Sequence, residues 1–287
     1  SLRNRRITLL RSSKWTRRPC VTAERTPPLM MALWAAGIGT GDEVIVPNIS
    51  FIATIGAVVH VGATPVICDV REDFLIDPAR IEEMVTEKTK AILPVHWTGR
   101  TCDMPTINAV AKAKGLTVIE DAAQSFLVKN QDKKYCGTKY NIGCFSLSIS
   151  KLINMVYGGF CATNSYKLAR NLVSIRNNGV DAEPENAKLE LAKQPGLNLK
   201  PSDLHSYIGC SNLKQRKQII ERVNQIYLIY KKNLKNNYIK LLDINSQNMP
   251  TIFVSAFVKN RTKFYSFCKK KNLSSQNVGT RHFIAFL

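Results

Sequence analysis

The chain of 287 residues lacks any apolar run of about 18 residues, the minimum length of a membrane-spanning helix. Its basic start, residues 1–6, is followed only by Ile-Thr-Leu-Leu, which is too short for the apolar core of a signal peptide. We therefore expect no transmembrane helix, no membrane partner and a cytoplasmic location.

The sequence also lacks the paired cysteines of a structural zinc site, because none of its eight cysteines forms a C-x-x-C pair or has a histidine close by. Several lie inside apolar strand patterns, where a free cysteine packs as a small hydrophobic side chain. The pattern predicts reduced cysteines and no metal site. The eight are Cys20, Cys68, Cys102, Cys136, Cys144, Cys161, Cys210 and Cys268.

Acidic residues are scarce: 21 Asp and Glu stand against 41 Lys and Arg, which gives a formal net charge of +20. Such an excess is typical of nucleic-acid-binding proteins, although no recognition motif accompanies it here. A cationic surface would equally attract anionic small substrates such as nucleotide-linked sugars. The charge alone leaves both classes of protein open.

Strand and helix patterns alternate from residue 26 onward. This alternation predicts a three-layer α/β fold with a mostly parallel central sheet and flanking helices. The expected strands are 44–47, 64–69, 90–96, 117–121, 144–151 and 157–163, and the helices between and after them are 51–61, 77–84, 104–114 and 167–176. A long amphipathic helix over 202–237, a strand at 251–258 and a helix at 263–271 follow.

These patterns divide the chain into three parts. Residues 1–25, with seven arginines and no periodicity, predict an irregular basic segment. Residues 26–205 predict the large domain, and residues 206–287 predict a long helix with a small, incomplete α+β domain. At the start of the large domain, Thr26 before Pro27 predicts an N-capped buried helix, whose free N–H groups would suit a phosphate.

Two buried-strand patterns end in polar residues that could share one site. The strand at 117–121 ends in Glu120 and Asp121, and the pattern at 144–151 ends in Lys151. Because ligands of open α/β sheets bind at the carboxyl ends of the strands, we expect Asp121 and Lys151 to meet there. The ordinary alternatives are a helix-capping acid and a solvated surface lysine.

An acid and an amine in one crevice are what pyridoxal phosphate (PLP) requires. PLP forms a Schiff base with a lysine, and its ring withdraws electrons while the pyridine nitrogen is protonated. A carboxylate beside that nitrogen favours the charged form. In this interpretation Asp121 is the carboxylate, and Lys151 holds the cofactor and later moves the proton between carbon atoms.

A series of motifs surrounds these two residues. In order they are Gly-x-Gly-Asp-Glu-Val-Ile-Val-Pro, Val-Gly-Ala-Thr-Pro-Val with Asp69, Lys-Ala-Ile-Leu-Pro-Val-His, Val-Ile-Glu-Asp-Ala-Ala-Gln, Ile-Gly-Cys-Phe-Ser and Ser-Lys. Over residues 29–213 the chain thereby resembles the DegT-type sugar aminotransferases, PLP enzymes of fold type I (aspartate aminotransferase-like). The resemblance implies transfer of an amino group, usually from glutamate, to a keto sugar carried on a nucleotide.

The resemblance also implies roles around the cofactor ring. Lys151 matches the Schiff-base lysine and Asp121 matches the partner of the pyridinium nitrogen. Gln124 falls where the family places a Gln or His beside the ring, near its phenolic oxygen. Phe51 matches an aromatic side chain that stacks on the ring, with an ordinary core phenylalanine as the alternative.

Three further residues match the family's ligands of the cofactor phosphate. Ser146 lies on the strand that leads to the lysine, and Thr26 matches the threonine of the family's Gly-Thr phosphate loop. Asn198 resembles an asparagine that reaches the phosphate of the neighbouring subunit, which implies a homodimer with shared active sites.

Departures from the family pattern occur at both ends of the chain. Arg25 replaces the glycine of the phosphate loop, whose conformation an arginine adopts less readily, and Pro27 and Pro28 replace small residues. From these departures we expect a truncated or frame-disturbed member of the family. The alternatives are a catalytically impaired relative with a regulatory role and, less favoured, a basic nucleic-acid-binding protein.

Overall fold

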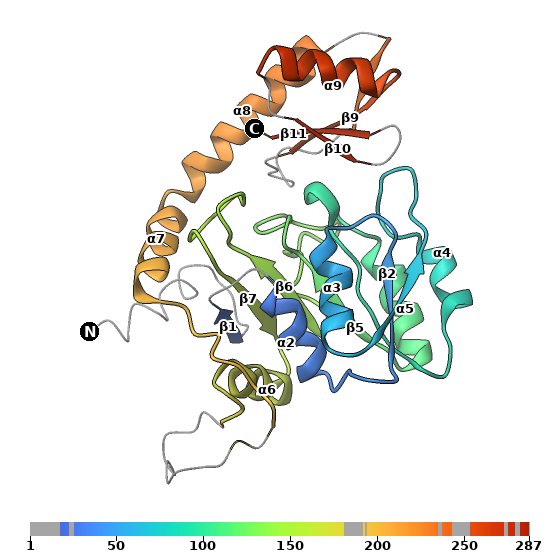
Figure 1. The fold of residues 1–287 in the computed structure, drawn as a ribbon, viewed down its shortest axis with the longest axis vertical. Coiled ribbons are helices and arrows are strands. Elements are labelled where there is room, and N and C mark those ends of the chain that lie inside the picture. Colours follow the sequence, from blue (N-terminus) through green and yellow to red (C-terminus); the bar gives the residue numbers. More distant parts are fainter. Residues whose placement is uncertain are drawn as a thin grey trace.

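The computed structural model describes residues 18–22, 26–180, 192, 194–234, 237–242, 253–272, 275–278 and 282–286. Within these ranges the chain forms a seven-stranded and a four-stranded sheet (Figure 1). None of the described helices is long and apolar enough to cross a membrane. All eight cysteines are free, and seven of them are buried, as their apolar surroundings in the sequence predict.

The large sheet is mostly parallel, and this confirms the predicted fold class. Its strands are β1 (Arg18–Thr22), β2 (Glu43–Pro47), β3 (Thr64–Cys68), β4 (Thr89–Ile92), β5 (Thr117–Asp121), β6 (Ile142–Ser146) and β7 (Gly159–Thr163). They lie in the order β1-β7-β6-β5-β4-β2-β3. The pairs among β2, β3, β4, β5 and β6 are parallel, whereas β7 runs antiparallel to both β6 and β1.

The helices connect and cover these strands. They are α2 (Pro27–Ala35), α3 (Ile52–His60), α4 (Pro78–Ile81), α5 (Met104–Lys114), α6 (Tyr166–Arg176), α7 (Asp203–Lys214), α8 (Arg216–Asn233) and α9 (Arg261–Lys270), with short 3-10 turns η1 (Glu82–Met84) and η2 (Trp97–Gly99). Local signals set their ends where they are strong. For example, Asp103 accepts a hydrogen bond from Thr106 at the start of α5, and Gly115 ends that helix with a φ of 68°.

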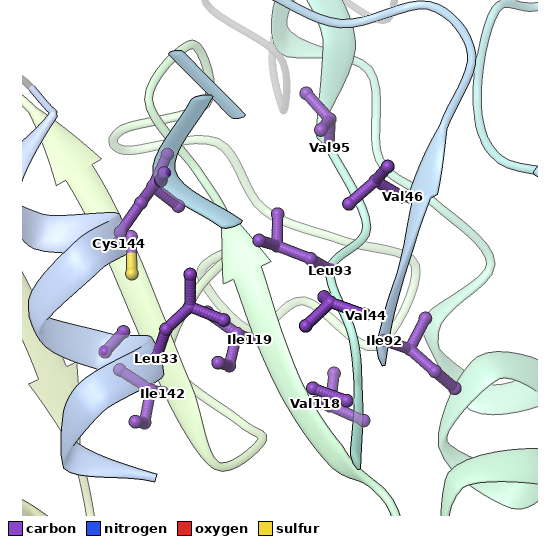
Figure 2. Packing of buried hydrophobic residues seen from close by; sticks show 14 of the residues in the cluster. Leu33, Val44, Val46, Ile92, Leu93, Val95, Val118, Ile119, Ile142 and Cys144 are labelled. Carbon is purple, nitrogen blue, oxygen red and sulfur yellow. The ribbon is translucent and has the colours of Figure 1, made fainter. Parts of the chain in front are cut away.

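The main core lies between α2 and the middle strands. Leu33 of α2 packs beside Ile119 of β5 and Ile142 of β6, and all three side chains are fully buried (Figure 2). Strand β6 is buried along its whole length, as expected of a strand whose two faces are both covered. This packing fixes the carboxyl ends of β5 and β6 next to each other.

The second sheet is antiparallel and has the order β10-β11-β9-β8. Its strands are β8 (Ile239–Leu241), β9 (Phe253–Val258), β10 (Ser275–Val278) and β11 (His282–Phe286), and α7 and α8 lead to it from the large sheet (Figure 1). Phe253 belongs to the main core, and the rings of Phe257 and Phe74 lie 5.5 Å apart. The second sheet therefore packs against the large one through β9.

Two expectations about the ends of the chain are wrong. Residues 18–22, expected to be irregular, form strand β1, because pairing with β7 places Cys20 opposite Cys161 in the sheet. The expected helix over 202–237 is divided at Gln215 into α7 and α8. The apolar spacing continues across that residue, and neither Gly nor Pro marks the break.

Candidate active site

The carboxylate of Asp121 lies at the end of β5 and is 5% exposed. Thr54 Oγ1 of α3 donates a hydrogen bond of 2.9 Å to its Oδ2, and the Ala123 N–H donates one of 3.1 Å to its Oδ1. Burial raises the pKa of Asp121 above its ordinary value, while the bonds from Ala123 and Thr54 and the charge of Lys151 act against that rise. The site thus holds a buried acid whose ionised form needs a nearby cation.

Lys151 supplies such a positive charge, since it acts electrostatically on Asp121. Because β5 and β6 are neighbouring parallel strands, Asp121 at the end of β5 and Lys151 beyond the end of β6 are at the same edge of the sheet. The expected strand up to Lys151 is wrong, however, because β6 ends at Ser146 and Lys151 lies on a turn beyond it. Its N–H donates to the carbonyl oxygen of Ser148 at 2.9 Å, so the turn is closed by main-chain hydrogen bonding.

Two buried hydroxyl groups lie between the strand end and the lysine. Ser146 Oγ donates to Ser148 Oγ at 3.3 Å, and the Ser148 N–H donates to Ser146 Oγ at 3.4 Å. Ser148 was not among the predicted site residues. Its sequence signal was the alternation of serines at 146, 148 and 150, which would place them on one face of a continuing strand.

The start of α2 does not offer the expected anion site. Pro27 and Pro28 have no N–H, and the N–H groups of Leu29 and Met30 both donate to the Thr26 carbonyl oxygen, at 3.0 and 3.4 Å. Thr26 is at the N-cap position with proline in the first turn, as predicted, but its side chain makes no capping hydrogen bond. An anion beside α2 would have to be held chiefly by hydroxyl groups.

Strand β6 places Ser146 close to the start of α2. Cys144 is on the same face of β6 as Ser146, and its thiol donates to the Pro28 carbonyl oxygen at 3.4 Å. From β7, the Cys161 thiol donates to the same oxygen at 3.1 Å. Thr26 and Ser146 are therefore on neighbouring segments, and Ser146 and Ser148 are suitable hydroxyl donors for a phosphate.

Gln124 lies in the turn that follows Asp121, and Phe51 lies at the start of α3. The Gln124 Oε1 accepts a hydrogen bond of 2.7 Å from the N–H of Thr98 in η2, so its carbonyl oxygen is already engaged. Phe51 immediately precedes α3, the helix that carries Thr54, and it is 62% exposed. That exposure excludes the ordinary core phenylalanine and leaves the ring accessible. Thr54 itself was missed in the sequence, where nothing distinguishes it from any threonine in a helix.

Asn198 lies apart from the other candidate residues. It is exposed and pairs through a single β-bridge with Asn177, at the end of α6. No hydrogen bond among the described residues joins it to Asp121, Lys151 or Ser146. A role for Asn198 in a neighbouring subunit stays a prediction.

The seven-stranded sheet, with an acid at the end of β5 and a lysine just beyond β6, has the architecture of the fold type I PLP-dependent transferases. Residues 17–285 match the model of the DegT/DnrJ/EryC1/StrS aminotransferase family, and the chain belongs to that family. The predicted resemblance is thereby confirmed.

Curated relatives resemble this chain over its larger part. It is 36% identical to GDP-perosamine synthase of Escherichia coli O157:H7 over 212 residues, which are 74% of this chain and 57% of the relative. It is 46% identical over 159 residues to UDP-N-acetyl-3-dehydro-alpha-D-glucosamine 3-aminotransferase of Acidithiobacillus ferrooxidans, covering 55% and 43% of the two chains. The chain thus spans about half the length of the curated relatives it matches.

Solved structures share the fold. NtdA of Bacillus subtilis, with bound cofactor PMP, is 28% identical, has a TM-score of 0.81, and is matched over 96% of this chain and 63% of its own. DesV of S. venezuelae has a TM-score of 0.84 at 22% identity, with coverage of 99% and 83%, and shows likeness of fold alone.

Proposed function

We propose that this chain is a PLP-dependent aminotransferase that moves an amino group from an amino acid, glutamate, to a keto sugar carried on a nucleotide. The observation that carries the proposal is the placement of the buried Asp121 at the end of β5 and of Lys151 just beyond β6, the neighbouring parallel strand. Family membership supports the reaction class. In this proposal residues 26–205 are the cofactor-binding large domain, and residues 206–287 contribute the small domain.

The residues at the site fit PLP at its ring and its aldehyde. When bound, PLP supplies an electron sink for the carbon that exchanges its amino group. Asp121 would hold a proton on the ring nitrogen, and Thr54 and Ala123 would orient its carboxylate through their hydrogen bonds. Lys151 would hold the cofactor through its amino group and, when displaced by the substrate, would hold and move a proton.

The cofactor phosphate would be held by hydroxyl groups. We assign this role to Ser146 and Ser148, with Thr26 from the start of α2, because no free N–H remains in the first turn of that helix. Asn198 of a second copy would complete the site, which makes the active form a homodimer. Gln124 and the exposed ring of Phe51 would lie beside the cofactor ring.

The names of the relatives support a nucleotide-sugar substrate, with a GDP-linked sugar in one and a UDP-linked sugar in the other. The net charge of +20 suits an anionic substrate of this class. Nucleic-acid binding, which the charge also allowed, has no motif or family evidence in its favour.

The test is the visible spectrum of the protein reconstituted with PLP. The wild type is expected to gain a visible absorbance band that Lys151→Ala abolishes and the exposed control Lys167→Ala retains. Glutamate should then convert the bound cofactor to its amino form. A wild-type protein that shows no visible band with PLP would contradict the proposal.

A catalytically impaired relative is the second candidate, and the start of α2 favours it. Without free N–H groups in that turn, the phosphate would be bound less tightly. This candidate predicts weak PLP binding and no spectral response to glutamate. Full conversion by glutamate would exclude it.

A further inference from the structure

A buried histidine and a buried glutamate are next to Asp121, and the proposed mechanism does not use them. The His96 Nε2 is 3.1 Å from the Glu120 Oε2, with the two side chains 0% and 2% exposed. Glu120 precedes Asp121 on β5, so the two carboxylates point to opposite faces of the sheet. Burying such groups has a high free-energy cost unless they are well paired, and their place therefore needs an explanation.

The hydrogen bonds around His96 define which ring nitrogen carries the hydrogen. The Cys102 N–H donates to Nδ1 at 3.2 Å, so Nδ1 presents a lone pair. The hydrogen is then on Nε2, which donates to Glu120 Oε2. The Nε2–H of His96 is in this way held in one orientation, toward Glu120.

Glu120 is also held by the turn at Gly137. The Gly137 N–H donates to the same Oε2 at 2.9 Å. Gly137 has a φ of +69°, and a Cβ there would come within 2.5 Å of Phe145. Gly143, paired with Glu120 across β5 and β6, has the Gly137 carbonyl oxygen 2.0 Å from its own ideal Cβ position. The turn thus packs closely against β6, and Glu120 accepts hydrogen bonds from both the turn and His96.

The same histidine holds the main chain of Asp121. The His96 N–H donates to the Asp121 carbonyl oxygen at 3.1 Å, and the Asp121 N–H donates to the Pro94 carbonyl oxygen at 2.9 Å. His96 thereby joins Glu120 through its side chain and Asp121 through its backbone. A displacement of His96 would therefore disturb the hydrogen bonds of both acids.

The pairing is poorly suited to stability alone. Among the described residues, Glu120 Oε1 has no hydrogen-bond partner although it is buried. A buried carboxyl oxygen left without a partner is destabilising, and an apolar pair of similar volume would avoid that cost. Directional bonds, by contrast, fix the position of the neighbouring backbone, which an apolar pair would not do.

We propose that Glu120 and His96 are positioning residues that aim the carboxylate of Asp121 at the cofactor. The proposal rests on the proposed function, because it assigns Asp121 to the ring nitrogen of PLP. Neither residue touches the cofactor. Their effect is exerted through the backbone at the end of β5.

The first test is Glu120→Met, which keeps a side chain of similar length but removes the oxygen that accepts from the His96 Nε2–H and the Gly137 N–H. Misplacing a binding group by about 1 Å can cost about 100-fold in rate. We expect PLP affinity to fall about tenfold or more, and the pH at which the visible band of bound PLP changes to shift. Both are read by absorbance titration and need no turnover.

Val118→Ala is the matched control, since Val118 is fully buried on the same strand and the same face as Glu120. It should lower the melting temperature and leave PLP affinity within about twofold of wild type. Equal losses of PLP affinity in Val118→Ala and Glu120→Met would overturn the proposal, as would an unchanged spectrum in Glu120→Met.

Glu120→Asp decides the question if Glu120→Met does not fold. It keeps the charge but draws the carboxylate back by about 1.5 Å, so that it no longer reaches both His96 and Gly137. A smaller loss of PLP affinity in the same direction is expected, and unchanged affinity would overturn the proposal. Failure of the wild type to bind PLP would instead reject the proposed function.

Discussion

Thr54 Oγ1 donates a hydrogen bond of 2.9 Å to Oδ2 of Asp121, and this bond ties α3 to the end of β5. The carboxylate is buried, so each donor that it accepts from lowers the free-energy cost of its ionised form. The hydroxyl of Thr54 and the N–H of Ala123 are its two donors among the hydrogen bonds of the described residues. Both are local, and each can be altered separately.

Thr54→Val should weaken PLP binding at neutral pH. Valine has nearly the volume of threonine but cannot donate, and hydrogen bonds to charged groups contribute about 1.5–3 kcal/mol. We expect PLP affinity to fall about tenfold or more in a spectroscopic titration. Thr64→Val, the same change on the exposed side of β3, should have no effect. Equal affinities of the two variants would show that Thr54 does not support Asp121.

The raised pKa of Asp121 predicts a pH dependence of stability in the cofactor-free protein. The folded state keeps this proton to a higher pH than the unfolded state, so stability falls as pH rises from the ordinary Asp pKa through the folded-state pKa. Asp121→Asn has no such proton and should gain stability relative to wild type over that window. The expected gain is about 1.4 kcal/mol for each unit by which the folded-state pKa exceeds the unfolded-state pKa.

Urea unfolding of both proteins at a series of pH values measures this difference, and other carboxyl groups cancel in the comparison. A difference in stability that does not change with pH would mean that Asp121 titrates normally in the folded protein. The same result would remove the electrostatic argument for a cation beside it.

Sequence signals predicted the parts of the fold that are set locally. Helix α5 begins at Met104 and ends before Gly115 as expected, because Asp103 and the left-handed glycine act on their own segment. Strand β1 was not predictable, since it is held by pairing with β7 and by hydrogen bonds with α6, both far along the chain. The division at Gln215 was missed for a similar reason, as no local residue marks it.

In the candidate site, too, the residues marked by a local pattern could be predicted, and those brought in by tertiary packing could not. Asp121 and Lys151 could be found because each ends an apolar run, and the edge of a parallel sheet brings such ends together. Thr54 and Ser148 join them only through tertiary packing and the turn beyond β6. The prediction of free N–H groups at the start of α2 is wrong. Pro27 and Pro28 have no N–H, and the next two N–H groups donate to the Thr26 carbonyl oxygen.

Gln124→Ala should destabilise the protein even without cofactor. Gln124 Oε1 accepts the 2.7 Å hydrogen bond from Thr98, whose φ of 50° is uncommon for a residue other than glycine. Removing the acceptor is expected to lower the free energy of unfolding by about 1–3 kcal/mol, as measured by urea unfolding. Gln124→Glu, which keeps an oxygen, should lose less, and the exposed control Gln131→Ala should lose nothing. If Gln124→Ala proves as stable as Gln131→Ala, the turn at η2 does not depend on this bond.

Ser255→Ala should stabilise the protein. Ser255 is on the same face of β9 as Phe253 and Phe257, because the three residues are two positions apart along the strand. Phe253 packs in the main core and Phe257 packs against Phe74, so the side chain of Ser255 faces the large sheet. Its Oγ is buried and has no hydrogen-bond partner among the described residues, and removing such a group relieves a desolvation cost of about 1–3 kcal/mol. We expect the melting temperature to rise by about 2–4 °C in calorimetry.

Ser165→Ala makes the same substitution at the N-cap of α6, where the hydroxyl accepts from Leu168, and should lower stability by about 1 kcal/mol. A loss of stability in Ser255→Ala would mean that its hydroxyl is satisfied in solution, and that the contact between β9 and the large sheet includes a polar bridge.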